Sequence, residues 1–234
     1  MLGRMMARMK TPTQERFFAG PLRAVWVGCA LLAAVALMAV FVPAEPLALE
    51  RSWAEAMRDL QTPVLKDVAL VFNALGHGLG RVLSLAAVAI VLVLAQRWLA
   101  FVAFAIAETL APLASSLLKA LIDRPRPPGG LVNPAGASFP SGHAAYAGAT
   151  CVALVLLFTA PGPGRHRWWA FAVLGIAAMA WSRTYIRVHW LLDVVSGSLL
   201  GVGVTLVVFG LAQRGAWHLG TRLGTIESGH QRST

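Results

Sequence analysis

The stretch AVWVGCALLAAVALMAVFV, residues 24–42, decides the class of fold, because it runs for 19 residues without a charged side chain. As an α-helix it would be about 28 Å long, enough to cross the apolar core of a bilayer. A cleaved signal peptide is the rival interpretation, since Val42-Pro43-Ala44 resembles a weak cleavage site. The run is longer than the usual apolar core of such a peptide, which favours a retained membrane anchor.

Five further apolar stretches follow, and together they predict an all-α membrane protein with six transmembrane helices in one bundle. The predicted spans after the first are 80–95, 98–118, 144–160, 168–181 and 194–212. Composition agrees, because hydrophobic residues make up 57% of the chain and charged residues only 13%, against about a quarter in typical soluble proteins. We predict a basic N-terminal segment (1–23), one six-span domain (24–212) and a C-terminal tail (213–234).

The basic residues predict the orientation in the membrane. The net charge is +10, but the cations are scattered between apolar spans, which argues against nucleic acid as a partner. Their excess in the N-terminal segment, the tail and two short connections places these parts in the cytoplasm. Segment 43–79 is more balanced in charge and is expected outside. It should hold one helix lying along the membrane surface, as indicated by the apolar spacing of Leu60, Val64, Leu65, Val68 and Phe72.

Three short charged motifs interrupt this apolar background, and the predicted topology brings all of them to the outer face. They are Lys119…Arg126-Pro127, Pro140-Ser141-Gly142-His143 and Ser182-Arg183…His189…Asp193. Charged groups are costly in or beside a membrane, so their clustering needs a purpose. Three cations, two histidines and a carboxylate at one place are typical of a site for an oxyanion such as phosphate.

His189 and Asp193 are four residues apart and would share one face of a helix. The carboxylate could then accept a hydrogen bond from one imidazole nitrogen and leave the other as a free lone pair, as a nucleophilic histidine requires. An ordinary polar pair at a helix end explains these two residues equally well when they are taken alone. The other two motifs favour the catalytic interpretation.

The Pro140-Ser141-Gly142-His143 motif comes directly before the apolar stretch that starts at Ala144. Ser141 can cap this helix, Gly142 permits close approach of the backbone, and the helix N-terminus favours a phosphate. His143 would be placed to give a proton to a leaving oxygen. Capping alone would also account for the motif.

The complete pattern resembles the three-part signature of the type 2 phosphatidic acid phosphatase superfamily, which includes membrane lipid phosphatases and, more distantly, vanadium haloperoxidases. All three motifs are present, in order, from Lys119 to Asp193. The resemblance implies that His189 attacks phosphorus to form a phosphohistidine, that Asp193 orients it, and that His143 protonates the leaving oxygen and then activates water. The implied phosphate-binding residues are Lys119, Arg126, Ser141, Gly142 and Arg183. No metal and no cofactor are implied.

Four nearby residues keep open interpretations. Arg124 also precedes a proline, but its spacing from Lys119 is too short for the motif, so Arg126 is preferred. Arg187 could contact a head group or a second phosphate, or be a solvated surface residue. Glu108, inside a span, is expected to have a structural partner, and His77 to lie in a loop. The segment 127–140, rich in proline and glycine, should be an ordered loop over the site.

The resemblance implies a lipid phosphate as substrate and the bilayer as partner. We expect undecaprenyl-type diphosphate, phosphatidylglycerol phosphate or phosphatidic acid, with polyprenyl diphosphate preferred because an outward-facing site suits recycling of a cell-wall carrier. A phosphotransferase using the same intermediate and a non-enzymatic anion transporter are the alternatives. A haloperoxidase is disfavoured because those relatives are not built from membrane spans. The sequence gives no prediction of oligomeric state.

Overall fold

The computed structural model describes residues 15–230, with side chains up to residue 218, and this part of the chain contains helices and no strand. The all-α class is therefore confirmed. The α-helices are α2 (Pro21–Phe41), α3 (Ala48–Asp59), α4 (Pro63–Leu75), α5 (Gly78–Leu94), α6 (Trp98–Leu121), α7 (Gly142–Phe158), α8 (His166–Tyr185) and α9 (Leu191–His230). A 3₁₀ turn, Pro163–Arg165, leads into α8.

Each of the six predicted spans coincides with one of these helices, but not all six are long and apolar enough to cross a membrane. Three helices are long and apolar enough, namely Pro21–Phe41, Trp98–Leu121 and Leu191–His218. Helices α4 and α5 together would make a fourth, bent span. Helix α7 has only 17 residues, and α8 carries Arg167 and Arg183 towards its ends. The number six therefore stays a prediction, whereas a membrane protein with several apolar spans is what the helices support.

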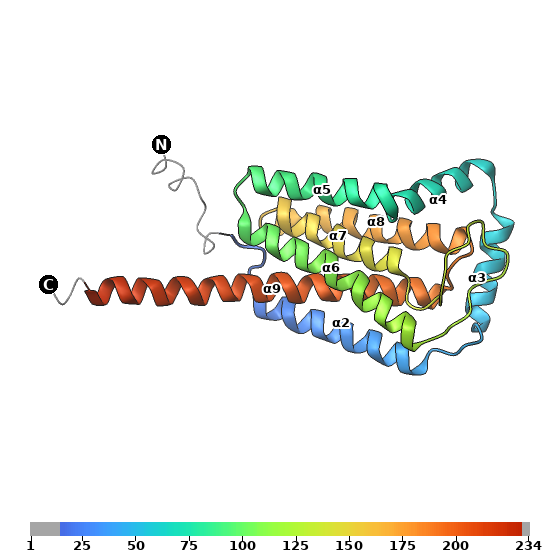
Figure 1. The fold of residues 1–234 in the computed structure, drawn as a ribbon, viewed down its shortest axis with the longest axis horizontal. Coiled ribbons are helices and arrows are strands. Elements are labelled where there is room, and N and C mark those ends of the chain that lie inside the picture. The colour runs from blue at the N-terminus through green and yellow to red at the C-terminus, as the bar shows by residue number, and fades with distance from the viewer. Residues whose placement is uncertain (1–14, 231–234) are drawn as a thin grey trace.

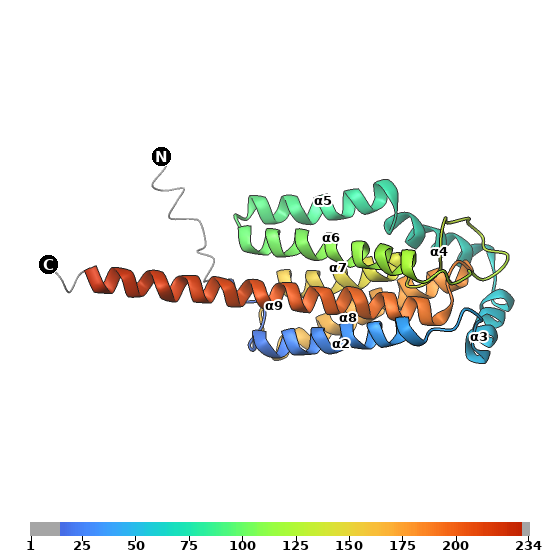
Figure 2. The same ribbon diagram turned by 60° about the horizontal axis from the view of Figure 1, so that its bottom comes forward.

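Glycines let the central helix α9 approach its neighbours closely. A Cβ atom on Gly28 of α2 would lie 2.8 Å from the backbone oxygen of Gly203 in α9, and one on Gly201 would lie 2.0 Å from the backbone oxygen of Ala145 in α7. Small residues at such crossings allow tight packing where no hydrophobic effect drives helices together. Figures 1 and 2 show α9 running beside α2 in both views, so the first apolar helix is packed into the bundle.

The segment expected to hold one surface helix contains two helices instead. Helix α3 crosses one end of the bundle, and α4 packs against α8 (Figure 1). The hydroxyl oxygen of Tyr185 on α8 accepts a hydrogen bond from the backbone N–H of Thr62, which precedes α4, at 2.9 Å. The predicted apolar set is divided, because Leu60 ends α3 while the other four residues lie on α4. The physical reason is Pro63, which begins a new helix after the Thr62 cap.

Helices α4 and α5 meet at a bend of 61° at Gly76-His77-Gly78. Gly78 has φ +53°, a left-handed conformation that glycine adopts without strain. His77 precedes the first turn of α5, in the loop where the sequence placed it. The bend brings the C-terminal end of α4 to the first turn of α7, where His143 lies.

All three charged motifs lie at the end of the bundle that α3 covers, opposite the end where α2 begins (Figure 1). Segment 127–140 contains no helix, as predicted, and the backbone N–H groups of Leu131 and Ser138 donate to the oxygens of Ile186 and Arg124. At the opposite end, the Gln213 side chain accepts hydrogen bonds from the backbone N–H groups of Phe17 and Phe18. Helix α9 continues through the predicted domain end at Ala212, and residues 1–14 of the basic N-terminal segment lie outside the described residues.

Candidate active site

His189 lies in the short connection between α8 and α9, with its ring buried and its two nitrogens facing different partners. Nδ1 lies 3.5 Å from Oδ2 of Asp193, a long contact for a hydrogen bond. Nε2 lies 3.4 Å from Nη1 of Arg126. Because a guanidinium can only donate, the tautomer with the lone pair on Nε2 and the proton on Nδ1 fits both contacts. That is the tautomer a nucleophilic Nε2 needs.

Burial lowers the pKa of His189 to about 4, although the Asp193 carboxylate opposes this shift. The positive charges of Lys119 and Arg183 add to the lowering, because they disfavour a second cation nearby. The imidazole is therefore neutral at physiological pH. A neutral ring retains the lone pair that the proposed chemistry uses.

The carboxylate of Asp193 is held by a buried arginine that the sequence left without a role. Nη1 of Arg124 donates to Oδ1 of Asp193 at 2.7 Å, and Nη2 donates to Oε2 of Glu50 at 2.6 Å. All three side chains are almost completely buried. Asp193 also accepts from the backbone N–H of Trp190 at 2.8 Å. Arg124 thus stabilises the charged form of Asp193, and its guanidinium is taken up by two carboxylates. The preference for Arg126 as the phosphate ligand stays a prediction.

Glu50 was not recognised from the sequence, where it is one of several acidic residues in an outer segment. Its carboxylate accepts from Arg124 and, at 3.0 Å, from the backbone N–H of Leu192 at the start of α9. It therefore joins α3 to the helix that carries Asp193. No spacing rule could have indicated it, because Glu50 and Asp193 are separated by most of the chain.

Lys119 and Arg126 converge on the same loop carbonyls. Nζ of Lys119 donates to the backbone oxygens of Ala137 and Ser138 at 2.8 and 3.0 Å. Nη2 of Arg126 donates to the same Ala137 oxygen at 3.0 Å, and its Nη1 donates to the Val188 oxygen at 2.7 Å. These two cations therefore both order the loop beside His189. Their predicted role in binding phosphate stays a prediction.

Arg183 reaches the site from α8 and pairs with a residue that the sequence reading did not single out. Its Nη1 donates to Oδ1 of Asn73 on α4 at 2.6 Å. The backbone oxygen of Asn73 lies 3.3 Å from Nε2 of His143. Asn73 therefore contacts one of the motif cations and the motif histidine of α7 together. The only available signal was its place three residues before the Gly76-His77-Gly78 break.

His143 is packed against the same break. Its ring stacks on that of His77 with centroids 6.2 Å apart and planes 6° apart. A Cβ on Gly76 would lie 2.4 Å from Cδ2 of His143, so any larger residue would displace the ring. His143, at the start of α7, and His189, in the connection before α9, lie at the same end of the bundle (Figure 1).

Ser141 and Gly142 begin α7. The Ser141 hydroxyl accepts from the backbone N–H of Ala144, the capping contact that the sequence predicted, at a long 3.4 Å. The backbone N–H of Ser141 donates to the backbone oxygen of Asp193 at 2.9 Å, which fixes α7 against α9. A Cβ on Gly142 would approach only Oγ of Ser115, at 3.7 Å, so protein packing does not require glycine there.

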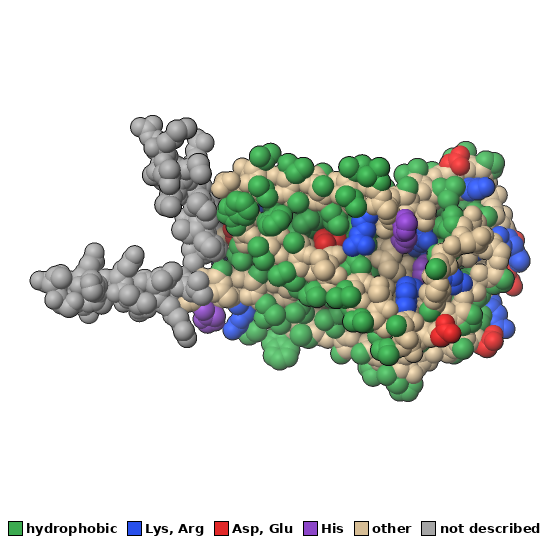
Figure 3. Space-filling view, in the orientation of Figure 1, with side chains coloured by type: hydrophobic (Ala, Val, Ile, Leu, Met, Phe, Trp, Pro, Cys, Tyr) green, Lys and Arg blue, Asp and Glu red, His purple; other side chains and the backbone are tan. Residues whose placement is uncertain are grey.

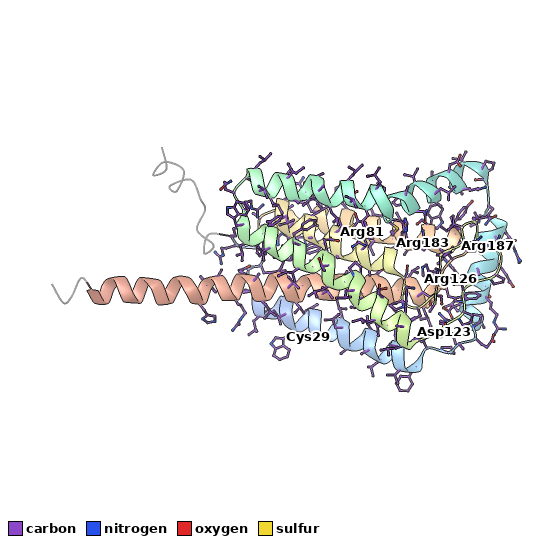
Figure 4. All side chains as sticks on the ribbon, viewed as in Figure 1. Cys29, Arg81, Asp123, Arg126, Arg183 and Arg187 are labelled. Atoms are coloured by element: carbon purple, nitrogen blue, oxygen red, sulfur yellow. The ribbon has the colours of Figure 1, made fainter. Side chains whose placement is uncertain are left out.

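Charged and histidine side chains gather on one face of the bundle, within a surface that is otherwise largely hydrophobic (Figure 3). Figure 4 shows Arg126 and Arg183 on this face, with Arg187 nearer the α3 end. Arg187 lines a pocket of about 180 Å³ with Arg51, Arg58 and Glu55, and its backbone has φ 57°. Glu108 has the structural partner expected of it, because Thr150 Oγ1 donates to its Oε1 at 2.7 Å. Among the described residues, no group of three or more His, Cys, Asp or Glu side chains is arranged to hold a metal ion.

The chain belongs to the PAP2 superfamily, because the family model of that description matches residues 97–217, just over half of its length. It is 36% identical over 75 residues to undecaprenyl-diphosphatase of Sulfolobus acidocaldarius, covering 32% of this chain and 33% of that protein. It is 32% identical over 107 residues to phosphatidylglycerophosphatase B of Bacillus subtilis, covering 44% of this chain and 53% of that protein. These matches span only about a third and a half of the relatives' lengths.

Two solved structures share the fold. The crystal structure of the transmembrane PAP2-type phosphatidylglycerolphosphate phosphatase of Bacillus subtilis superposes with a TM-score of 0.70 at 21% identity, covering 81% of this chain and 97% of that chain. The structure of Aquifex aeolicus LpxE gives a TM-score of 0.58 at 24% identity, covering 69% and 95%. Both likenesses concern the fold. Together with the family match they bear out the resemblance seen in the three motifs.

Proposed function

We propose that the protein is an integral membrane lipid phosphatase that removes the terminal phosphate of a lipid phosphate or diphosphate. The observation that carries this proposal is the orientation of His189, whose Nδ1 faces the Asp193 carboxylate while its Nε2 faces the Arg126 guanidinium. A phosphoryl group bound by Arg126 would therefore lie next to the lone pair on Nε2 of His189. Its charged oxygens would then lie among the cations that phosphoryl transfer requires.

In the proposed reaction, Nε2 of His189 attacks phosphorus and the bond to the leaving lipid oxygen breaks, giving a phosphohistidine. Burial and the charge of Arg183 lower the pKa of His143 to about 3 in the free site. The negative charge of a bound phosphoryl group would raise this pKa, so that His143 can take up a proton and donate it to the leaving oxygen. Water then gives a proton to His143 and attacks the phosphohistidine, which releases inorganic phosphate and restores both rings. Lys119, Arg126 and Arg183 hold the phosphoryl oxygens, with Ser141 and the Gly142 backbone N–H at the N-terminus of α7.

The names of the sequence relatives support undecaprenyl diphosphate and phosphatidylglycerol phosphate as substrate candidates, and phosphatidic acid remains a third. We keep the preference for a polyprenyl diphosphate. A cavity of about 390 Å³ between α5 and α6 is lined largely by apolar side chains, including Leu85, Phe101 and Phe104. It supports access of a lipid tail from the bilayer between helices.

The test is phosphate release from a panel of these three lipids in detergent micelles, with His189→Ala as the inactive variant. His166→Ala is the matched control, because His166 is exposed at the start of α8, at the other end of the bundle. Radiolabelled substrate should leave an acid-labile, base-stable label on the wild type and none on His189→Ala. Undiminished release by His189→Ala would overturn the proposal. Phosphate moved onto an acceptor lipid with little free phosphate would identify a phosphotransferase, and binding without turnover a transporter.

We further infer that the site faces outwards and that both termini are cytoplasmic, as the basic residues of the sequence indicate. The motifs share one end of the bundle, and α2 begins at the other. In a background with Cys29 and Cys151 replaced by serine, Asp123→Cys should react with a membrane-impermeant thiol reagent on intact cells. His166→Cys should react only after the membrane is opened. The reverse pattern would overturn the orientation.

A further inference from the structure

One cation on the open face of the bundle has no part in the motifs. Arg81 lies in the first turn of α5, directly after the Gly76-His77-Gly78 break. A helix N-terminus is the unfavourable end for a positive side chain, because the helix dipole is positive there. An arginine at this place is therefore better accommodated when an anion is close by.

Two contacts fix the position of Arg81. Its Nη2 donates to the backbone oxygen of Glu108 on α6 at 3.1 Å, and its Cζ lies 5.3 Å from the ring centroid of Tyr146 on α7. Tyr146 follows His143 by three residues on α7. Since a helix rises about 1.5 Å per residue, Arg81 lies about one turn further into the bundle than His143. Figure 4 shows the same order, with Arg81 farther from the α3 end than Arg183 and Arg126.

The surroundings of Arg81 suit a ligand with a polar end and an apolar tail. The side chain is partly exposed and lines the cavity of about 390 Å³ between α5 and α6. The other lining residues include Leu85, Ala89, Phe101, Phe104 and Ala105. Glu108 also lines it: its Oε1 accepts from Thr150, its Oε2 has no hydrogen-bond partner among the described residues, and its carboxyl lies close enough to Arg81 for the two charges to attract. Within the described part of the chain, the bond to the Glu108 backbone oxygen is the one hydrogen bond made by the Arg81 guanidinium, while the Arg81 backbone N–H donates to the His77 oxygen at 3.4 Å.

Resting on the proposed function, we propose that Arg81 binds a second phosphate on the lipid side of the reacting one and so selects substrates that carry two. If His143 protonates the leaving oxygen, the rest of the substrate must extend from His143 towards the tail. Arg81 lies on that route. In a lipid diphosphate the second phosphorus is bonded directly to the leaving oxygen, and in phosphatidylglycerol phosphate it follows after one glycerol. A lipid monophosphate has no group for Arg81 to bind.

The experiment compares kcat/KM for two matched pairs: farnesyl diphosphate with farnesyl monophosphate, and phosphatidylglycerol phosphate with phosphatidic acid of the same acyl chains. Arg81→Gln should lower the value for the two-phosphate members about 10- to 100-fold, as expected for loss of one charge-assisted hydrogen bond, and leave the monophosphates within about twofold. Arg81→Lys should restore part of the loss. Arg167→Gln, on the exposed first turn of α8, is the control and should change nothing.

The outcomes separate the two proposals. An equal loss on all four substrates, or no loss on the two-phosphate lipids, would overturn the role of Arg81 while leaving the phosphatase in place. The proposed function, and with it this role of Arg81, would be overturned by either of two results. One is that the wild type releases phosphate from none of the four substrates, and the other is that His189→Ala releases phosphate at the full rate. A measurement without any variant gives a second check. A farnesyl bisphosphonate should inhibit the wild type at least about tenfold more tightly than the monophosphonate, and equal inhibition would contradict the proposal.

Discussion

Nη1 of Arg124 lies 2.7 Å from Oδ1 of Asp193, and both side chains are fully buried. The other half of the same guanidinium binds Glu50 at 2.6 Å. Two carboxylates from α3 and α9 thus share one arginine from the loop after α6. The arrangement keeps Asp193 charged beside His189 and ties three separate segments together behind the site.

We expect Arg124→Met to lower the free energy of unfolding by about 3–5 kcal/mol, because it leaves two buried carboxylates without their cation. Thermal unfolding in detergent measures the loss. Arg126→Gln is the matched control. It should retain most of the stability while losing about 10²–10³ in kcat, the scale for one preorganised oxyanion donor. A stable Arg124→Met protein, or an Arg126→Gln protein that unfolds as easily as Arg124→Met, would contradict this division of roles.

We expect Gly76→Ala to reduce turnover without unfolding the protein. The new Cβ would lie 2.4 Å from Cδ2 of His143, so the ring must move, while the backbone at φ −91° tolerates alanine. Steady-state kinetics should show at least about a tenfold fall in kcat, since catalytic geometry is sensitive to shifts of about 1 Å. Gly164→Ala is the control, because a Cβ there meets nothing within 4 Å. Equal activity of the two variants would show that the position of His143 does not limit turnover.

We expect the His189 ring to titrate near pH 4 and not near 6.5. Its pKa is lowered, so the ring is neutral and nucleophilic above about 4 and gains its proton only as the pH falls through that value. Side-chain NMR of ¹⁵N-histidine protein in detergent measures this directly, with His189→Asn to assign the signal. A signal that titrates near 6.5 would mean that the ring is not held in the buried, cation-rich site described above.

We expect chelators to leave hydrolysis within about twofold of its initial rate, because fixed cations can stabilise the transferring phosphoryl group. Vanadate should inhibit competitively, since it mimics five-coordinate phosphorus. Phosphate release with and without EDTA checks the first expectation. Activity lost with EDTA and regained with a divalent ion would contradict the metal-independent scheme.

The sequence alone determined the membrane class, the positions of the six apolar helices and the charged motifs, because these are local properties. An uncharged run of 19 residues such as 24–42 is expected to form a membrane-spanning helix, because in a bilayer its backbone groups must bond to one another. The spacing of His189 and Asp193 predicted a shared helix face, which was wrong, because His189 lies in the connection before α9; the two side chains still meet, with Nδ1 3.5 Å from Oδ2. Helix breaks were harder to read. Pro63 divided the outer segment into two helices, and the number of spans could not be fixed from apolarity alone.

The tertiary structure decided which distant residues support the site. Glu50 and Asn73 lie far from the motifs in the chain, yet one binds Arg124 and the other binds Arg183. Arg124 and Arg126 are two residues apart, but only the fold sends one behind Asp193 and the other towards His189. Such partners depend on the packing of α3 and α4 over the bundle end. The contacts join residues that are distant in sequence, and no local pattern encodes them.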